Sequence, residues 1–349
     1  MTEELQKEGL AQWERDYLQV LRDLLEKSQS QTVPRSDRTG TGVASKFGCQ
    51  LRVALRPGRL PALVTKQVHL KSVFVELFWF LTGQSNIEML REHDVKIWDK
   101  WELNGEVGPM YGVQWRRWEG ADGLRYDQIA DLLINLQIDP YSRRHVVSAW
   151  NPSVLPHAGM SPQENVAAGR AALAACHMAF QAYVDDMTVS ERVYAGIRLR
   201  NAPTEALEAL TGVEDAGAHH MLDQLGVPSR KLSLRVDQRS ADWFLGVPFN
   251  ITSYALLTHM LCKVCGYYPG ELVMQFGDIH LYSNHQAQAQ EQLDRAGLAL
   301  QGKADIQYPH FSFNEGSMAA PNYLDNLTLE DIDVTHYKHM GRLLAEVAK

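Results

Sequence analysis

The stretch "QRSADWFLGVPFNITSYALLTHM", residues 238–260, connects a predicted strand to a predicted helix. Just before it, apolar and polar residues alternate over 231–236, as they do in a half-buried strand. Toward its end, a largely apolar run predicts a helix from about 250 to 265 that stops at Gly266. Helices and strands follow one another in this way along the chain without a strict βαβ rhythm, which predicts an α/β (α+β) fold.

The same stretch carries polar residues among aromatic, glycine and proline residues: Arg239, Ser240, Asp242 and Asn250. A solvated loop does not have this composition. Each of these polar side chains needs a partner if it is buried. A bound polar ligand and an internal hydrogen-bond network both satisfy that need, and this segment alone leaves both interpretations open.

Working outward, periodic patterns predict further elements on both sides. The expected helices cover residues 3–27, 71–83, 125–137 and a short piece around 204–211, and the expected strands cover 46–55, 143–150, 176–184 and 271–282. Two segments rich in small and turn-forming residues, at about 154–170 and 189–230, interrupt the pattern as surface insertions. The chain is otherwise free of internal repeats and low-complexity sequence.

Composition excludes several classes of function. Lys and Arg total 34 against 42 Asp and Glu, a formal charge of −8, so the chain lacks the basic surface expected of a protein whose main partner is nucleic acid. The first residues do not have the pattern of a signal peptide, and the apolar runs are too short to span a membrane. Four cysteines in a chain of this length are not a disulfide framework, so we expect a cytoplasmic protein without a membrane partner.

The apolar run "LAACHMAFQAYV", residues 173–184, places Cys176 next to His177. If this run is a strand, neighbouring side chains point to opposite faces, so His177 is not the base that activates Cys176. A cysteine in an apolar strand is more often a small core residue than a nucleophile. A catalytic role therefore requires another group that lowers its pKa.

Two other candidate clusters favour structural interpretations. Cys262 and Cys265 have C-x-x-C spacing, but they lie in an apolar helix without a second pair of ligands. The adjacent His219 and His220 likewise have no companion ligand set, which is typical of solvated surface residues. The sequence predicts no metal site.

Taken together and in order, ten blocks resemble the thymidylate synthase family. They are "DRTGTG", "VTKQVHLKS", "VELFWFLTG", "IWDKW", "GPMYGVQWR", "DPYSRRHVVSAWN", "ALAACH", "QRSADWFLGVPFNITSYALLTHM", "FGDIHLYSNH" and the final "AEVAK". The resemblance implies one catalytic domain over residues 1–349, built on a mixed sheet flanked by helices, with insertions at about 154–170 and 189–230. It also implies a homodimer that forms through the sheet.

The implied reaction is transfer of a one-carbon unit from 5,10-methylenetetrahydrofolate to C5 of dUMP, giving dTMP and dihydrofolate without a metal. By resemblance, Cys176 is the nucleophile that adds to C6 of uracil, which makes C5 reactive. Glu76 organises proton transfer through water, and Tyr111 helps to remove the C5 proton. Arg239 lies near both thiol and phosphate, where its charge favours the thiolate. Asn250 reads uracil, because its carboxamide donates to O4 and accepts from N3–H.

The resemblance also assigns binding residues. The 5′-phosphate is bound by several arginines and a serine, with the Arg143–Arg144 pair supplied by the other subunit: Arg38, Arg143, Arg144, Arg239 and Ser240. His280 and Tyr282 match the pair that binds the 3′-hydroxyl. The folate is held by His69, Trp98, Asp242 and the C-terminal tail around Ala348. The resemblance also makes Asp242 a catalytic residue and a dUMP-binding residue.

The sequence departs from the family pattern in four places. Ala175 replaces the proline before the nucleophile, Asp237 replaces a tyrosine, and Ala179 stands where an aromatic is usual. The terminal Lys349 extends a tail that is normally small and apolar. That tail excludes water, so a hydroxymethylase that makes 5-hydroxymethyl-dUMP and tetrahydrofolate is the alternative. An RNA-binding regulator or inactive scaffold of the same fold is the alternative from a different class, and the acidic composition argues against RNA.

Overall fold

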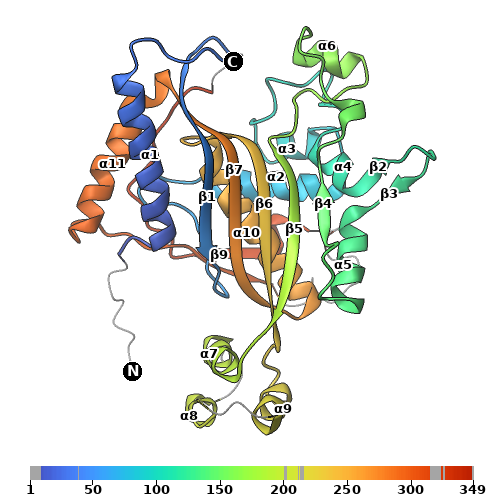
Figure 1. Cartoon of the computed structure of the whole chain (residues 1–349), viewed down its shortest axis with the longest axis vertical. Coiled ribbons are helices and arrows are strands. Elements are labelled where there is room, and N and C mark those ends of the chain that lie inside the picture. The colour runs from blue at the N-terminus through green and yellow to red at the C-terminus, as the bar shows by residue number, and fades with distance from the viewer. Residues whose placement is uncertain are drawn as a thin grey trace.

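The computed structural model describes residues 9–37, 39–199, 203–210, 212, 216–314, 324 and 327–347. Its centre is a five-stranded sheet in the order β1–β7–β6–β5–β4 (Figure 1). The strands are β1 (Val43–Ala54), β7 (Tyr268–Tyr282), β6 (Arg230–Asp242), β5 (His177–Asp186) and β4 (Val146–Ser148). β6 and β7 run parallel and the other pairs run antiparallel, so the predicted α/β fold with a mixed sheet is confirmed.

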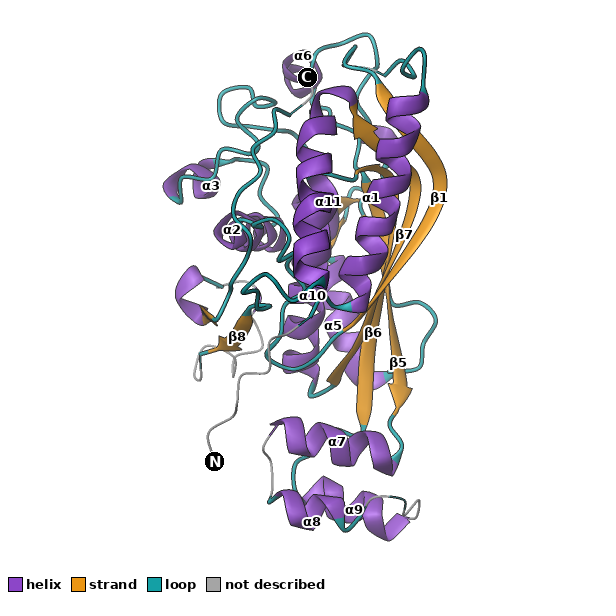
Figure 2. Ribbon diagram, turned by 90° about the vertical axis from the view of Figure 1, so that its left-hand side faces the viewer, coloured by secondary structure: helices purple, strands orange, loops and turns teal. Residues whose placement is uncertain are grey.

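Helices cover one face of the sheet. In Figure 1, α2 and α10 lie behind the strands, and Figure 2 shows α2, α10 and α11 on the same side of the sheet. The helices of this layer are α1 (Gln12–Ser30), α2 (Leu70–Thr82), α5 (Gln128–Ile138), α10 (Gly246–Cys265) and α11 (Gln286–Leu300). α10 is buried along nearly its whole length against β6 and β7. The core therefore lies between this helical layer and the sheet.

The opposite face of the sheet is not covered by any helix of the described chain over its middle (Figures 1 and 2). Its strands carry exposed large side chains, including Phe47, which is 88% exposed, and Tyr183, which is 64% exposed. Single exposed apolar residues are ordinary, but aromatic residues on an uncovered sheet face are typical of an interaction surface.

Apart from three helices between β5 and β6, the other described elements connect these layers. They are α3 (Glu88–Glu92), α4 (Tyr111–Arg117), β2 (Trp118–Glu119), β3 (Arg125–Tyr126), α6 (Pro162–Ala167), β8 (His310–Phe313), β9 (Ile332–Thr335) and three short 3₁₀ turns, Pro152–Val154, Ser283–His285 and Leu329–Asp331. α6 lies in the first predicted insertion and begins with a capping box between Ser161 and Glu164.

Several predicted boundaries need correction. The first helix begins at Gln12, because residues 9–11 are not helical and residues 1–8 lie outside the described chain. The expected helix at 125–137 begins later, since residues 125–126 form β3 and the Asp127 carboxylate caps α5 by accepting from Ala130 N–H at 2.9 Å. The strand expected at 143–150 is limited to Val146–Ser148.

Two helix ends agree with the predictions for a physical reason. Gly83 follows α2 with a φ of 70°, and Gly266 follows α10 with a φ of 72°. These left-handed conformations favour glycine, which lacks the Cβ atom that penalises them. β6, in contrast, runs to Asp242, several residues beyond the alternation that predicted it.

The segment predicted as the second insertion stands where two paired strands would otherwise be joined by a hairpin turn. Asp186 and Arg230 are paired residues at the ends of β5 and β6, and the chain between them forms α7 (Val189–Leu199), α8 (Thr204–Glu208) and α9 (Ala216–Gln224) below the sheet (Figure 2). These helices bury a small hydrophobic cluster of their own around Val193, Leu207 and Leu222. The segment is therefore attached to the sheet edge and does not form part of the main core.

A buried arginine joins two of these helices. The Arg192 side chain is 1% exposed and donates to Asp223 at 2.6 Å, to the carbonyl of His219 at 3.0 Å and to that of Val227 at 2.8 Å. This network is not predictable from local sequence, because arginine side chains are usually solvated.

We expect the sheet to fold without the insertion. Replacing residues 187–229 with Asn-Gly should connect Asp186 to Arg230 through a type I′ turn, since those residues are already paired across the two strands. The far-UV circular dichroism spectrum and cooperative thermal unfolding should be kept. Loss of cooperative unfolding would mean that the insertion is required by the main core.

Candidate functional site

The six predicted catalytic residues come from four elements and from the segment that precedes β5. Cys176 immediately precedes β5, Glu76 is in the middle of α2, and Tyr111 begins α4. Arg239 and Asp242 lie on β6 and Asn250 lies in the first turns of α10. All except Tyr111 are partly exposed, although many of their neighbours are buried. Such polar groups at the edge of a core are accessible to a ligand.

Arg239 holds the segment that precedes the cysteine. Its Nε donates to the carbonyl of Ala175 at 2.9 Å and its Nη2 donates to that of Ala174 at 2.9 Å. Its backbone N–H donates to the carbonyl of Cys176 at 2.8 Å, and its guanidinium lies 5.4 Å from the centre of the Trp150 ring. A permanent cation is thus anchored beside the backbone that presents the thiol, where positive charge favours a thiolate.

Tyr111 contacts the same segment from the other side. Its hydroxyl oxygen accepts the Cys176 backbone N–H at 2.7 Å, and its ring stacks on His177 with centroids 4.6 Å apart. Burial raises the pKa of Tyr111 well above its usual value, so the phenol stays protonated and remains able to donate its proton in a hydrogen bond. Tyr111 therefore places a neutral hydroxyl next to the nucleophile candidate.

Asn250 lies in a polar network with a defined orientation. Its Oδ1 accepts from Gln238 Nε2 at 3.1 Å, and its Nδ2 lies 3.1 Å from His177 Nε2. Burial lowers the pKa of His177 to about 4, so the ring is neutral and its Nε2 accepts from the amide. The other ring nitrogen lies 3.2 Å from the Tyr254 hydroxyl. Asn250 keeps a second N–H and a second lone pair for a ligand.

Among the described residues, the Glu76 carboxylate accepts one hydrogen bond, from Trp98 Nε1 to Oε1 at 2.7 Å. Burial of the carboxylate raises its pKa to about 7, and the hydrogen bond from Trp98 opposes that shift only in part. A carboxyl group with this pKa exchanges a proton readily near neutral pH, as an acid–base group requires.

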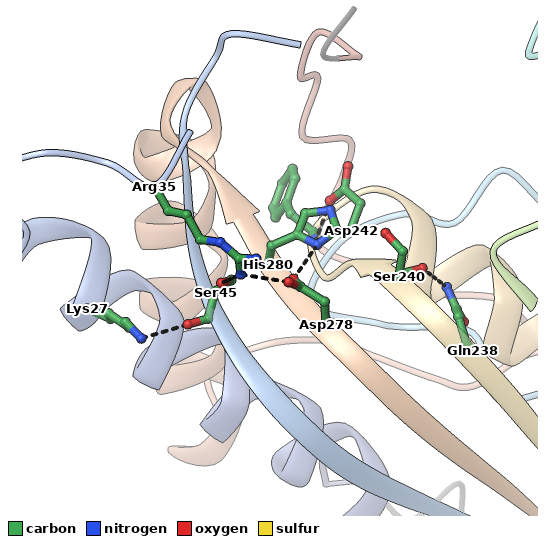
Figure 3. Close-up of polar contacts among 9 residues, drawn as sticks. Lys27, Arg35, Ser45, Gln238, Ser240, Asp242, Asp278 and His280 are labelled. Atoms are coloured by element: carbon green, nitrogen blue, oxygen red, sulfur yellow. Dashed lines mark hydrogen bonds and ion pairs between the residues drawn. The ribbon is translucent and has the colours of Figure 1, made fainter. Parts of the chain in front are cut away.

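The far ends of β6 and β7 carry the next set of polar residues (Figure 3). Ser240 pairs with Asp278, and Asp242 pairs with His280, across the two parallel strands. The Asp242 carboxylate accepts from the backbone N–H groups of Phe244 and Leu245, at 3.1 and 2.9 Å. The rings of His280 and Tyr282 lie 5.2 Å apart. The structure thus brings four predicted binding residues to one end of the sheet.

Other predicted binding residues are not joined to this cluster. Arg143 and Arg144 are exposed in the turn before β4, and no side-chain hydrogen bond or ion pair to another described residue is seen for either. His69 is exposed beside Ser72 at the start of α2. Trp98 is 7% exposed and packs among Trp79, Trp101 and Tyr111. Arg38, Ala348 and Lys349 lie outside the described residues.

Sequence reasoning missed four residues of this site. His177 was considered only as a base for Cys176, and both of its nitrogens instead face other partners. Gln238 and Tyr254 orient Asn250 and His177, but an amide in a strand and a tyrosine in an apolar helix gave no signal. Lys66 is buried with its ammonium bonded to the carbonyl of Phe244, and burial lowers its pKa to about 7. A lysine within "LVTKQV" was the available clue.

The other two candidate clusters are the Cys262–Cys265 pair of α10 and the His219–His220 pair of α9. Cys262 is buried and burial raises its pKa, and burial raises that of Cys265 to about 11, so neither thiol is poised to react. His220 is exposed, as expected, but His219 is half-buried and its Nδ1 lies 3.1 Å from Arg192 Nη1, so its interpretation as a solvated surface residue is wrong. Within the described residues, no group of three or more His, Cys, Asp or Glu side chains is arranged to hold a metal ion, and no helix is long and apolar enough to cross a membrane.

A comparison with protein families supports the resemblance found in the sequence. The model of the family described as thymidylate synthase matches residues 15–201 and 215–349. The gap between the two matched ranges, residues 202–214, falls inside the segment predicted as the second insertion. It lies between α7 and α9 and contains α8.

Proposed function

Because the chain belongs to the thymidylate synthase family, whose members transfer a one-carbon unit from methylenetetrahydrofolate to dUMP, we propose that it methylates dUMP reductively. The products are dTMP and dihydrofolate, and the whole chain, 1–349, acts as one catalytic domain with two insertions. The observation that supports this proposal best is the cluster in which Cys176, Tyr111, His177 and Asn250 are held together by direct contacts.

In this proposal the Cys176 thiolate forms a bond to C6 of uracil, and the electron pair moves onto O4 so that C5 becomes nucleophilic. C5 then bonds to the methylene carbon of the folate substrate while the bond from that carbon to N10 breaks. The C5 proton passes to a water molecule, which the neutral Tyr111 hydroxyl helps to orient. Loss of tetrahydrofolate leaves an exocyclic methylene, which accepts a hydride from that tetrahydrofolate. Departure of the cysteine releases dTMP. Arg239 favours the thiolate throughout.

Asn250 recognises the uracil base. One of its N–H groups faces His177 and one lone pair faces Gln238, so the amide cannot rotate without losing both contacts. The free N–H donates to O4 of uracil and the free lone pair accepts from N3–H. We assign the phosphate to Arg38, Arg239 and Ser240, the sugar hydroxyl to His280 and Tyr282, and the folate to His69, Trp98, Asp242 and Ala348.

The product is tested by incubating the protein with dUMP and 5,10-methylenetetrahydrofolate. Mass spectrometry identifies the nucleotide, and absorbance follows dihydrofolate. Joint appearance of dTMP and dihydrofolate supports the proposal. A hydroxymethylated nucleotide without dihydrofolate would identify the alternative enzyme, in which water reaches the exocyclic methylene past the tail ending in Lys349. Bound dUMP without any product would point to an inactive scaffold.

We expect ionisation of the Glu76 carboxyl group to affect both the stability of the folded protein and kcat near neutral pH. Its folded-state pKa is raised to about 7, so the folded protein holds a proton that the unfolded chain releases between about pH 4.5 and 7. Stability contributed by that proton is therefore lost as pH rises through this window. Relative to wild type, Glu76→Gln should be more stable at pH 8 by up to about 3 kcal/mol, and equally stable near pH 4.5.

The same Glu76→Gln variant should lower kcat about 10²- to 10³-fold, because it removes an acid–base group. Urea unfolding at several pH values and steady-state kinetics measure the two effects. A stability difference that does not change with pH would show that the carboxyl group of Glu76 titrates normally in the folded protein.

We also propose a homodimer through the uncovered sheet face, with shared active sites. The exposed aromatic side chains of Phe47 and Tyr183 on this face, and the exposed guanidinium groups of Arg143 and Arg144, support it. An arginine pair whose side chains have no partner among the described residues of its own chain suits a phosphate bound by the neighbouring subunit.

Mixing two inactive variants tests the sharing. Cys176→Ala and the Arg143→Ala/Arg144→Ala variant should each be inactive alone. After unfolding and refolding as a 1:1 mixture, heterodimers should contain one intact site, restoring about one quarter of wild-type activity. If each subunit has a complete site of its own, the mixture stays inactive.

A further inference from the structure

A row of polar side chains crosses from the segment before β1 to the end of β7 (Figure 3). Arg35 Nη1 donates to Ser45 Oγ at 2.7 Å and to Asp278 Oδ2 at 2.8 Å. The other carboxylate oxygen of Asp278, Oδ1, lies 3.3 Å from His280 Nδ1. The two oxygens of one carboxylate therefore serve two different donors.

The backbone holds this row in place. Arg35 exchanges two backbone hydrogen bonds with Val43, of 3.1 and 3.0 Å, which fix it to the start of β1. Ser45 lies directly opposite His280 in the β1–β7 pair, and the His280 carbonyl accepts from Trp243 N–H at 2.9 Å. The Arg35 side chain itself is 62% exposed, so its position depends on these neighbours.

The carboxylate determines which nitrogen of His280 carries the proton. A carboxylate only accepts hydrogen bonds, so Nδ1 must be the protonated nitrogen, and a neutral ring then has a lone pair on Nε2. Arg35 occupies Oδ2 and leaves Oδ1 for the histidine. We propose that Asp278 and Arg35 are positioning residues, which act through His280 by keeping it in the tautomer that accepts a hydrogen bond from the sugar 3′-hydroxyl of the nucleotide.

This inference rests on the proposed function and deepens it. A hydroxyl group has one proton to donate and lone pairs that accept. Nε2 of His280 accepts the proton, while the phenol of Tyr282, which lies on the same strand with its ring 5.2 Å from the imidazole, can donate. In the opposite tautomer Nε2 of His280 would be a donor, and the hydroxyl proton would be left with the phenol oxygen of Tyr282, which is a weaker acceptor than an imidazole nitrogen.

The test compares dUMP with 2′,3′-dideoxyuridine 5′-monophosphate, which lacks the 3′-hydroxyl, by isothermal titration calorimetry. Wild type should bind dUMP at least about tenfold more tightly than the dideoxy nucleotide. Asp278→Asn should lower affinity for dUMP about tenfold and affinity for the dideoxy nucleotide less than twofold. A merely structural role would weaken both ligands equally, which would overturn the inference.

Arg35 provides a second, sharper test. In Asp278→Asn the side chain has one oxygen, and Arg35 competes for it, so the NH₂ group turns toward His280 and forces the wrong tautomer. Removing the competitor in Arg35→Met/Asp278→Asn lets that oxygen face His280 again. The double variant should therefore bind dUMP more tightly than Asp278→Asn alone. Equal or weaker binding by the double variant would contradict the proposed tautomer.

Lys46→Met is the matched control. Lys46 lies on β1 next to Ser45 and forms an ion pair of similar exposure with Asp23 of α1, at 3.3 Å. The Lys46→Met variant should bind dUMP and the dideoxy nucleotide with wild-type affinity. If wild type binds neither nucleotide, the proposed function fails. If wild type binds both equally, the positioning inference fails while the proposed function stands.

Discussion

Cys176→Ala should abolish turnover while leaving dUMP binding within about threefold of wild type. We expect kcat to fall at least about 10⁴-fold, because without a covalent bond to C6 the C5 carbon of uracil is too weak a nucleophile. Binding should persist, because the groups assigned to the base and sugar, including Asn250 and His280, are not altered. The Tyr111 hydroxyl also keeps its hydrogen bond, since it contacts the backbone N–H of residue 176.

The chain offers a matched control in Cys265→Ala. Cys265 is also partly exposed, but burial raises its pKa to about 11 and it lies at the end of α10. This variant should keep wild-type kcat. Rapid-quench product analysis with calorimetry of dUMP binding separates chemistry from binding. If kcat of Cys176→Ala were more than a hundredth of the wild-type value, the covalent mechanism would be contradicted.

Asn250→Asp should change the preferred base from uracil to cytosine. A carboxylic acid with one protonated oxygen donates to N3 of cytosine and accepts from its 4-amino group, the reverse of what uracil requires. His177 is neutral, so it can adopt the tautomer that donates Nε2–H to the new carboxyl group. Two mismatched hydrogen bonds of about 1.4 kcal/mol each should reduce the preference for dUMP over dCMP about 100-fold.

Competition between dUMP and dCMP in a single reaction, with both products measured by mass spectrometry, gives this ratio directly. Asn250→Ala serves as the control, because it removes the same contacts to His177 and Gln238 without offering the reversed pattern. It should weaken turnover of dUMP without creating activity on dCMP. An unchanged ratio in Asn250→Asp would refute the assignment of base recognition to this amide.

The structure also shows which contacts are made by two residues, Ala175 and Asp237, that differ from the family pattern. Ala175 replaces a proline, yet its carbonyl still accepts from Arg239, because a carbonyl is available from any residue. Asp237 replaces a tyrosine on the uncovered face and pairs with Arg235 at 2.8 Å. These substitutions keep the contacts near Cys176 and alter a surface that we assign to the partner subunit.

The local sequence pattern predicted a helix or strand correctly where a single cause, such as a helix-ending glycine or the alternation of apolar residues, sets the conformation. Glycine ends α2 and α10 because only glycine adopts the left-handed conformation there cheaply, and alternation identified the strands of the sheet. The same reasoning failed at boundaries set by side-chain contacts across the chain, such as the cap of α5 by Asp127. Motif order, which depends on no contact, was enough to identify the family.

What only the tertiary structure decided is how these residues meet. Asn250 and His177 are 73 residues apart and Tyr111 and Cys176 are 65 apart, so no local pattern could reveal that each pair is in contact. The pKa of Glu76 near 7 and that of His177 near 4 arise from burial, which depends on the packing of distant elements around each side chain. The sequence thus determined which chemical groups are present, and folding determined their protonation, orientation and partners.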